Sequence, residues 1–177
     1  MRGRWPLWLP LALFGAFIAL VVAGLYWPSS RDVSSAMIGK PIPQFALPAA
    51  SGDRPGLATA DLQSGQPRLL NVFASWCLPC IAEAPVLAQL KAQGVQIDGV
   101  AIRDRKEDLA AFLLRNGNPY ARIGADNERK LQLAIGSSGV PESFVVDGAG
   151  VIRYQHIGGI RPEQIPMILQ RLAEARR

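Results

Sequence analysis

The longest apolar block of the chain lies at its beginning. Residues 6–27 are almost wholly apolar and include no charged side chain. A run of this length can cross a hydrocarbon core of about 30 Å as a helix. Arg2 and Arg4 precede the block, so the positive-inside rule predicts that residues 1–5 lie in the cytoplasm and that the rest of the chain lies beyond the membrane. The pattern therefore predicts a single-pass transmembrane anchor.

A cleaved signal peptide is the alternative interpretation of the same block. Val21-Val22-Ala23 resembles a small-residue cleavage site after a shorter apolar core. Both interpretations export the remainder of the chain, so the expected compartment does not depend on the choice. We expect a retained anchor in the inner, or cytoplasmic, membrane.

The pattern beyond the apolar block changes to that of a globular domain. Residues 28–40 are rich in serine and predict a polar linker, whereas residues 41–177 alternate between strand and helix periods. Strands are expected at 45–47, 68–74, 95–102, 121–123, 143–146 and 151–156, and helices at 77–93, 106–115, 128–135 and 162–176. This order joins a βαβ unit to a ββα unit, which predicts an α/β fold with one mixed central sheet flanked by helices.

Candidate chemistry is concentrated at the start of the helix expected at 77–93. The two cysteines of the chain, Cys77 and Cys80, form a C-x-x-C pair there, directly after a buried strand. The free N–H groups and the positive dipole end of a helix N-terminus favour a thiolate at Cys77. Cys80 lies one turn further in, where we expect it to be more shielded. The spacing predicts a reversible disulfide in which Cys77 attacks and Cys80 resolves.

The same cysteine pair could instead be part of a metal site or a purely structural disulfide. Structural zinc needs about four protein ligands, and the chain has two cysteines and a single histidine, His156. A purely structural disulfide would close so short a loop that it would constrain the unfolded chain little. A copper site could be built from both thiols and His156. We therefore expect no resident metal, and a Cu(I)-binding chaperone stays as an alternative function.

The charge of the chain gives no support for a nucleic-acid partner. Lysine and arginine total 19 and aspartate and glutamate total 14, which gives a formal charge of +5 that includes Arg2 and Arg4. The densest basic cluster lies within residues 103–106, where an aspartate is interleaved with it and two further acidic residues follow. Such mixed charge is typical of a solvated helix start.

The arrangement around the cysteine pair resembles the thioredoxin family. Trp76 precedes the pair, Pro85 lies where that family bends its active-site helix, and Gly139-Val140-Pro141 precedes a strand as the family's cis-proline loop does. The resemblance implies a thioredoxin-like fold from about Met37 to the carboxyl end, with Pro141 in cis.

Within that family the chain resembles the membrane-anchored CcmG/DsbE reductants. The shared features are the segments 38–48 and 70–77, Glu83 three residues after the second cysteine, and the loop 139–144 with an acidic residue after its proline. The resemblance implies a periplasmic thiol:disulfide oxidoreductase that reduces apocytochrome c, or its heme-ligation chaperone, during cytochrome c maturation. No flavin or nicotinamide fingerprint is present and no cofactor is expected, so electrons would return from a transmembrane thiol transporter.

The resemblance also suggests which residue moves a proton. Asn71 occupies the position where thioredoxin has a buried aspartate, and asparagine cannot titrate. Glu83 lies three residues after Cys80 on the same helix face and is the expected substitute. Glu142 would add a second negative charge near the thiols. Because negative charge opposes thiolate formation, we expect a reducing rather than a strongly oxidising pair.

The client-binding residues are expected on both sides of the cysteine pair. A cis bond at Pro141 would turn the backbone of Val140 toward the disulfide, where it can pair with an extended polypeptide as an added strand. Trp76 would add apolar contact, and Glu142 follows the proline directly. The client would then be a polypeptide.

Two further functions stay open on the sequence alone. Peroxidases of related fold share an opening like residues 39–43, but they carry a threonine three residues before the reactive cysteine, where this chain has Ala74. A general exported reductant or isomerase of broad specificity would use the same cysteines.

Overall fold

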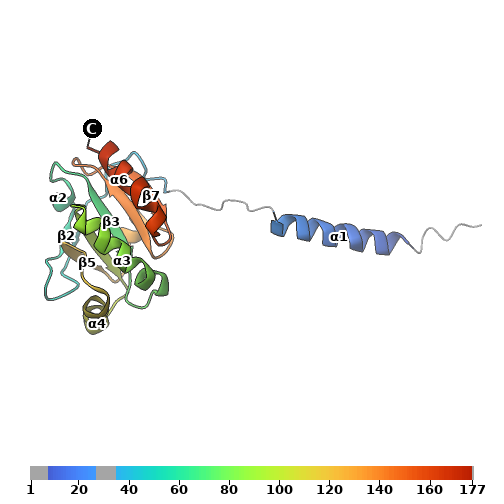
Figure 1. Cartoon of the computed structure of the whole chain (residues 1–177), viewed down its shortest axis with the longest axis horizontal. Helices are drawn as coiled ribbons and strands as arrows, with labels where there is room; N and C mark the ends of the chain where they lie inside the picture. Colours follow the sequence, from blue (N-terminus) through green and yellow to red (C-terminus); the bar gives the residue numbers. More distant parts are fainter. Residues whose placement is uncertain (1–7, 27–34, 177) are drawn as a thin grey trace, which may run out of the picture. The chain divides into compact units, whose positions relative to one another are not determined.

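The structure is a computed structural model that describes residues 8–26 and 35–176 (Figure 1). It divides into two compact units, the first of which contains helix α1 (Leu9–Tyr26). This 18-residue helix is long and apolar enough to cross a membrane, and none of its side chains is buried. Pro10 lies in its first turn, where a missing N–H costs nothing. The predicted cytoplasmic segment 1–5 lies outside the described residues, as do both ends of the predicted span.

The second unit is built on a five-stranded mixed sheet with the strand order β5-β4-β3-β6-β7. Its strands are β3 (Arg68–Phe73), β4 (Ile97–Ile102), β5 (Arg122–Asp126), β6 (Glu142–Val146) and β7 (Ile152–Ile157). β3 runs parallel to β4, and β4 runs parallel to β5. β6 runs antiparallel to both β3 and β7. The sheet is therefore mixed, as the sequence predicted.

The central strand β3 is covered on both faces. Five of its six residues are buried, which is why its sequence reads as an unbroken apolar run rather than an alternating one. Asn71 is the exception in chemistry, because it is polar and wholly buried. Its side chain points to the face on which the active-site helix packs, as its hydrogen bond to Glu83 shows.

The three longer helices of this unit come after strands in the chain: α3 (Leu78–Ala92) after β3, α4 (Lys106–Asn116) after β4, and α6 (Ile165–Glu174) after β7. Figure 1 shows α3 and α6 in front of the same face of the sheet. An aromatic cluster joins α4 to that face, since the ring of Phe73 lies 5.9 Å from Phe112 and 4.5 Å from Tyr120, centroid to centroid. Pro85 lies inside α3, which continues past it to Ala92.

The opposite face carries three short elements, of which the sequence predicted only the first, as a strand at 45–47. They are β1 (Ala46–Leu47), β2 (Leu57–Ala58) and the single-turn helix α2 (Thr59–Leu62). A Cβ on Gly124 of β5 would lie 2.7 Å from the Cβ of Leu47, so only glycine allows β1 this close to the sheet. β2 and α2 are so short that they carry almost no periodic signal, so hydrophobic patterning did not identify them. The remaining short elements are α5 (Lys130–Ala134) and η2 (Pro162–Gln164).

The folded unit begins earlier than the sequence predicted. The expected linker ran from residue 28 to Lys40, but the described part of it, residues 35–40, packs on the domain. Ser35 is only 6% exposed. The N–H of Gly39 donates to the carbonyl of Ile152 at 2.7 Å, so this segment lies along β7. Residues 28–34 of the predicted linker lie outside the described residues.

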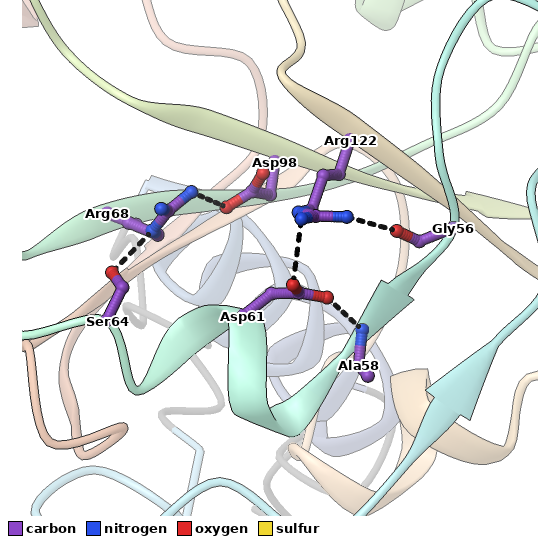
Figure 2. A network of polar contacts seen from close by, with 7 residues as sticks. All are labelled: Gly56, Ala58, Asp61, Ser64, Arg68, Asp98 and Arg122. Atoms are coloured by element: carbon purple, nitrogen blue, oxygen red, sulfur yellow. Dashed lines mark hydrogen bonds and ion pairs between the residues drawn. The ribbon is translucent and has the colours of Figure 1, made fainter.

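A polar network lies on the α2 side of the sheet (Figure 2). Asp98 of β4 is wholly buried and its Oδ2 lies 3.0 Å from the Nη1 of Arg68. Arg122 forms a second ion pair, at 3.0 Å, with Asp61 of α2. Burial raises the pKa of Asp98, and the charge of Arg68 opposes that rise. The Arg122–Asp61 pair thus joins α2 to the edge strand β5, while the buried Arg68–Asp98 pair joins β3 to β4.

Replacing Arg68 by alanine should destabilise the oxidised protein by about 3 kcal/mol at pH 7, because Asp98 would remain buried without its cation. The loss should shrink as the pH falls, since protonation of a carboxyl group with a raised pKa removes the unpaired charge. Urea unfolding at pH 7 and pH 5 measures both effects.

The matched control is Arg105→Ala. Arg105 is 83% exposed in its side chain and lies 3.9 Å from Asp108, so its loss should cost no more than about 0.5 kcal/mol. Equal effects of the two substitutions would show that the buried pair contributes no more than a surface pair.

Candidate active site

The cysteine pair lies at the N-terminus of α3, just beyond the end of β3. Cys77 is the N-cap residue of α3. A disulfide joins it to Cys80, with the two Cα atoms 5.3 Å apart. The Sγ of Cys77 also accepts a hydrogen bond from the backbone N–H of Cys80 at 3.2 Å. Cys77 therefore has the N–H group that would stabilise a thiolate at this position.

Exposure does not distinguish the two sulfur-bearing residues. Cys77 is 4% exposed and Cys80 is 3% exposed. The two residues are almost equally buried, so the expected stronger shielding of Cys80 does not explain their different roles. The helix terminus separates them, because only Cys77 caps it. The neighbours of the pair face solvent instead, with Trp76 57% and Leu78 76% exposed. A buried disulfide is thus flanked by an exposed apolar surface.

Trp76 is held in place by the loop after β4. Its indole Nε1 donates to the carbonyl of Arg103 at 3.2 Å. The carboxylate of Asp104 accepts from the N–H of Ser75 at 2.7 Å and also from the Ser75 hydroxyl. Arg103 adopts a positive φ of 46°, a conformation that non-glycine residues seldom take. Sequence reasoning treated this segment only as a charged helix start, because nothing local links it to the cysteines.

The proline loop has the predicted conformation, since the Val140–Pro141 peptide bond is cis. The loop lies against the active-site helix. A Cβ placed on Gly159 would lie 3.5 Å from the carbonyl oxygen of Pro79, 3.7 Å from the Cβ of Glu83 and 3.7 Å from the Cγ of Pro141. The start of α3, the proline loop and the segment after β7 therefore meet at one point, which the sequence separates by up to 80 residues.

Glu142 is buried rather than exposed beside the thiols. It is 1% exposed, and its Oε1 accepts from the N–H groups of Ser138 at 2.9 Å and Gly139 at 3.1 Å. Its Oε2 accepts from the Nε2 of Gln155 at 3.0 Å. The expected direct contact between Glu142 and a client is therefore corrected: its carboxylate faces inward and holds the loop that contains Val140 and Pro141.

Glu83 is the acid buried on the active-site helix itself. It is 2% exposed. Its Oε1 accepts from the N–H of Ile160 at 2.9 Å, and its Oε2 accepts from the Nδ2 of Asn71 at 3.3 Å. Burial raises the pKa of Glu83 to about 7, and these two hydrogen bonds only partly oppose the rise. The carboxyl group can therefore gain or lose a proton near neutral pH.

Asn71 connects Glu83 to two further polar groups. Its Nδ2 also donates to the hydroxyl of Ser143 at 3.0 Å, and its Oδ1 accepts from the hydroxyl of Tyr120 at 2.8 Å. Burial raises the pKa of Tyr120 well above its ordinary value, with a smaller contribution from the charge of Glu83. The sequence indicated Asn71 and Glu83, but Tyr120, Ser143 and Ile160 had no local signal.

The copper alternative called for His156 beside the two thiols. Among residues 8–26 and 35–176, no three histidine, cysteine, aspartate or glutamate side chains come together as a potential metal cluster. His156 lies in β7 opposite Ser143 and is 8% exposed. Burial lowers its pKa. The histidine proposed for a copper site is therefore a largely buried residue of the sheet.

Comparison with known proteins agrees with this geometry. The redoxin family model matches residues 37–170. The thiol:disulfide interchange protein DsbE of Escherichia coli (strain K12) is 41% identical over 169 residues, which cover 90% of this chain and 88% of that protein. The thiol:disulfide interchange protein HelX of Rhodobacter capsulatus is 36% identical over 159 residues and 90% of each chain. The crystal structure of a DsbE-type protein from Chlorobium tepidum matches with a TM-score of 0.64 and 28% identity, over 79% of this chain and 98% of that one.

A redox-active C-x-x-C pair at the start of a helix, facing a cis-proline loop on a mixed sheet, defines a disulfide oxidoreductase of thioredoxin-like fold. Within that class, the chain belongs to the DsbE family of thiol:disulfide interchange proteins.

The charge state of Glu83 should make stability depend on pH. The folded protein keeps the Glu83 proton up to about pH 7, whereas an ordinary glutamate loses it near pH 4.5. Folding therefore takes up a proton between these values, and stability falls as the pH rises through them. The cost above pH 7 is about 3 kcal/mol.

Glu83→Gln should remove this part of the pH dependence. Between pH 5 and pH 8, the free energy of unfolding of the oxidised wild type should fall relative to the variant by up to about 3 kcal/mol, as measured by denaturant unfolding. Glu163→Gln, at an exposed carboxylate of η2, should keep the wild-type slope. Parallel pH profiles for wild type and Glu83→Gln would contradict the raised pKa.

Proposed function

We propose that this protein reduces the disulfide of apocytochrome c, or of the chaperone that presents it for heme ligation, during cytochrome c maturation. The observation that carries the proposal is the near-full-length similarity to DsbE proteins, with the cysteine pair, the cis-proline loop and Glu83 brought together in one site. Thiol:disulfide interchange is the chemistry of the family, and the nature of the client is what we add.

The cycle starts from the reduced pair. The Cys77 thiolate attacks one sulfur of the client disulfide, so that bond breaks, a mixed disulfide forms and the other client sulfur leaves as a thiolate. The Cys80 thiolate then attacks the Cys77 sulfur and releases the second client thiolate. The client has gained two electrons and, with protons, two thiols. The protein is left with the Cys77–Cys80 disulfide that the structure contains.

Cys77 is assigned the attacking role because of its helix position. It is the N-cap of a 15-residue helix, and its sulfur already accepts the Cys80 N–H. Cys80 lies inside the first turn, where it faces the protein interior together with Glu83, three residues further along the helix. The assignment therefore rests on electrostatics at the helix end rather than on exposure.

Glu83 is proposed to take the proton of Cys80 in the second step. A thiol must lose its proton before it attacks the mixed disulfide, and a buried site offers little water to accept it. A carboxylate whose pKa is about 7 can accept that proton at neutral pH. Asn71 and the N–H of Ile160 orient the carboxylate without titrating themselves.

The client is proposed to bind as an extended strand across the proline loop. The carbonyl of Pro141 already accepts from Gly158 at 3.0 Å, which orients the loop, and the half-buried Val140 precedes it. The exposed apolar side chains of Trp76 and Leu78 lie on either side of Cys77 in the chain and would contact the client there. Main-chain pairing would supply affinity and these side chains would supply contact area.

Helix α1 is proposed to anchor the protein in the inner membrane, with the catalytic domain in the periplasm. Its length and lack of charge suit a single span. A transmembrane thiol transporter is the proposed source of electrons, since the described residues include two cysteines and their disulfide must be reduced again after each cycle.

Expressing the full chain with Cys80→Ser should trap the client. The first attack would proceed, but the mixed disulfide through Cys77 could not be resolved, so a covalent complex should accumulate. Non-reducing electrophoresis and mass spectrometry would identify the captured protein. Cys77→Ser is the matched control and should capture far less.

The identity of the captured protein decides between two functions. Apocytochrome c, or a protein that binds it, supports the proposed role. Recovery of many unrelated exported proteins would instead support a general reductant or isomerase of broad specificity.

Trp76→Ala should raise the KM for a disulfide-bonded client peptide by about tenfold while kcat changes little, because the contact it makes is equally available before and during the reaction. Steady-state kinetics of the full-length protein would measure it, with a dithiol supplied in excess to reduce the Cys77–Cys80 disulfide again after each turnover. Leu114→Ala removes another highly exposed apolar side chain, on α4, and should leave KM unchanged. An unchanged KM for Trp76→Ala would remove this residue from the client-binding surface.

A further inference from the structure

A continuous set of hydrogen bonds runs from the first described residue of the domain to the proline loop. The backbone N–H of Ser35 donates to the Oε1 of Gln155 at 2.6 Å. The Nε2 of Gln155 donates to the Oε2 of Glu142 at 3.0 Å. The other carboxylate oxygen of Glu142 accepts from the N–H groups of Ser138 and Gly139. These bonds link residues more than 100 positions apart in the chain.

The three residues that lead to the loop are buried. Ser35 is 6% exposed, Gln155 is 8% exposed and Glu142 is 1% exposed. Buried polar bonds of this kind are strong and costly to leave incomplete. A loosened Ser35 would therefore leave the amide oxygen of Gln155 without its donor, and the disturbance would reach the Glu142 carboxylate through one side chain.

The side-chain amide of Gln155 suits this position because it has both an acceptor oxygen and a donor nitrogen. One end must accept from the Ser35 N–H, and the other must donate to a carboxylate. A glutamate at the same position would turn a second carboxylate toward Glu142, and an apolar side chain would leave both partners unsatisfied.

Ser35 is also fixed from its other side. Its hydroxyl donates to the carbonyl of Ile135, at the end of α5, at 2.6 Å. A Cβ on Gly136 would lie 2.5 Å from that hydroxyl oxygen, so the two chain segments are in close contact. Ile135 and Gly136 lead directly into the loop that Glu142 holds. Ser35 thus braces the entry to the proline loop while Gln155 and Glu142 hold its backbone.

We propose that Ser35 and Gln155 are positioning residues for client binding, which act through Glu142 on the loop that contains Val140 and Pro141. The proposal rests on the proposed function of that loop as the surface to which an extended client adds. Neither residue touches the disulfide or the client. Their effect would be to keep the loop backbone ready to pair, so that a client does not have to order it on binding.

The first test measures the loop directly in the full chain, in detergent micelles. Gln155→Met and Ser35→Ala should each speed amide hydrogen exchange of Ser138 and Gly139 by about fivefold, which corresponds to the loss of roughly one hydrogen bond. Ser35→Thr, which keeps the hydroxyl, should restore slow exchange. Gln170→Met is the control, because Gln170 is an exposed amide on α6 that donates to Glu174. Unchanged exchange in Gln155→Met would overturn the proposal.

The second test separates positioning from general destabilisation. With a disulfide-bonded C-x-x-C-H peptide, Gln155→Met should raise KM about fivefold and leave kcat near the wild-type value. With hydroxyethyl disulfide, which has no peptide backbone to pair with the loop, its rate should not change. Equal losses on both substrates, or faster exchange without a change in KM, would overturn the proposal.

These two measurements also keep the proposal distinct from the proposed function. If the wild type binds the peptide but Gln155→Met does so equally well, only the positioning role fails. If the captured client of the Cys80→Ser chain is unrelated to cytochrome c, the client assignment fails, while the exchange rates of Ser138 and Gly139 and the peptide KM still decide the role of Ser35 and Gln155.

Discussion

A carboxyl group sealed between the active-site helix and its surroundings is the interaction on which the site depends. Glu83 takes one hydrogen bond from the backbone of Ile160 and one from Asn71 of the central strand. It therefore joins α3 to the central strand and to the segment that follows β7. Its burial is also what moves its pKa to about 7. The burial of Glu83 therefore has two effects: it places the carboxylate where it can join α3 to its neighbours, and it raises the pKa so that the group can exchange a proton near neutral pH.

The two buried acids of the site are used in different ways. Glu142 accepts from Ser138, Gly139 and Gln155, so its oxygens are occupied by donors that shape a loop. Glu83 has two donors and lies on the helix that carries the cysteines. A carboxylate surrounded by donors is a structural fastener, whereas one with few donors is available for proton transfer. From the sequence alone, both acids were expected to be negative charges near the thiols, with no difference in role between a loop-holding and a proton-accepting carboxylate.

The redox site is assembled at a junction rather than within one element. Cys77 comes from the end of a βα turn, Pro141 from the loop just before β6, and Gly159 from the segment that follows β7. Because the junction is closed by backbone groups and buried side chains, changes as distant as Ser35 reach it through direct hydrogen bonds, without any movement of whole elements.

The sequence alone determined the apolar helix near its beginning, the cysteine pair at a helix start, the larger strands and helices and the cis-proline loop, because each depends on a local pattern or a short motif. It indicated Glu83 through its spacing from Cys80. Only the tertiary structure decided that both cysteines are equally buried, that Glu142 faces inward, and that Tyr120, Asp104 and Gln155 support the site. These facts depend on contacts between segments distant in sequence, and burial and hydrogen-bond partners exist only once those segments have packed together.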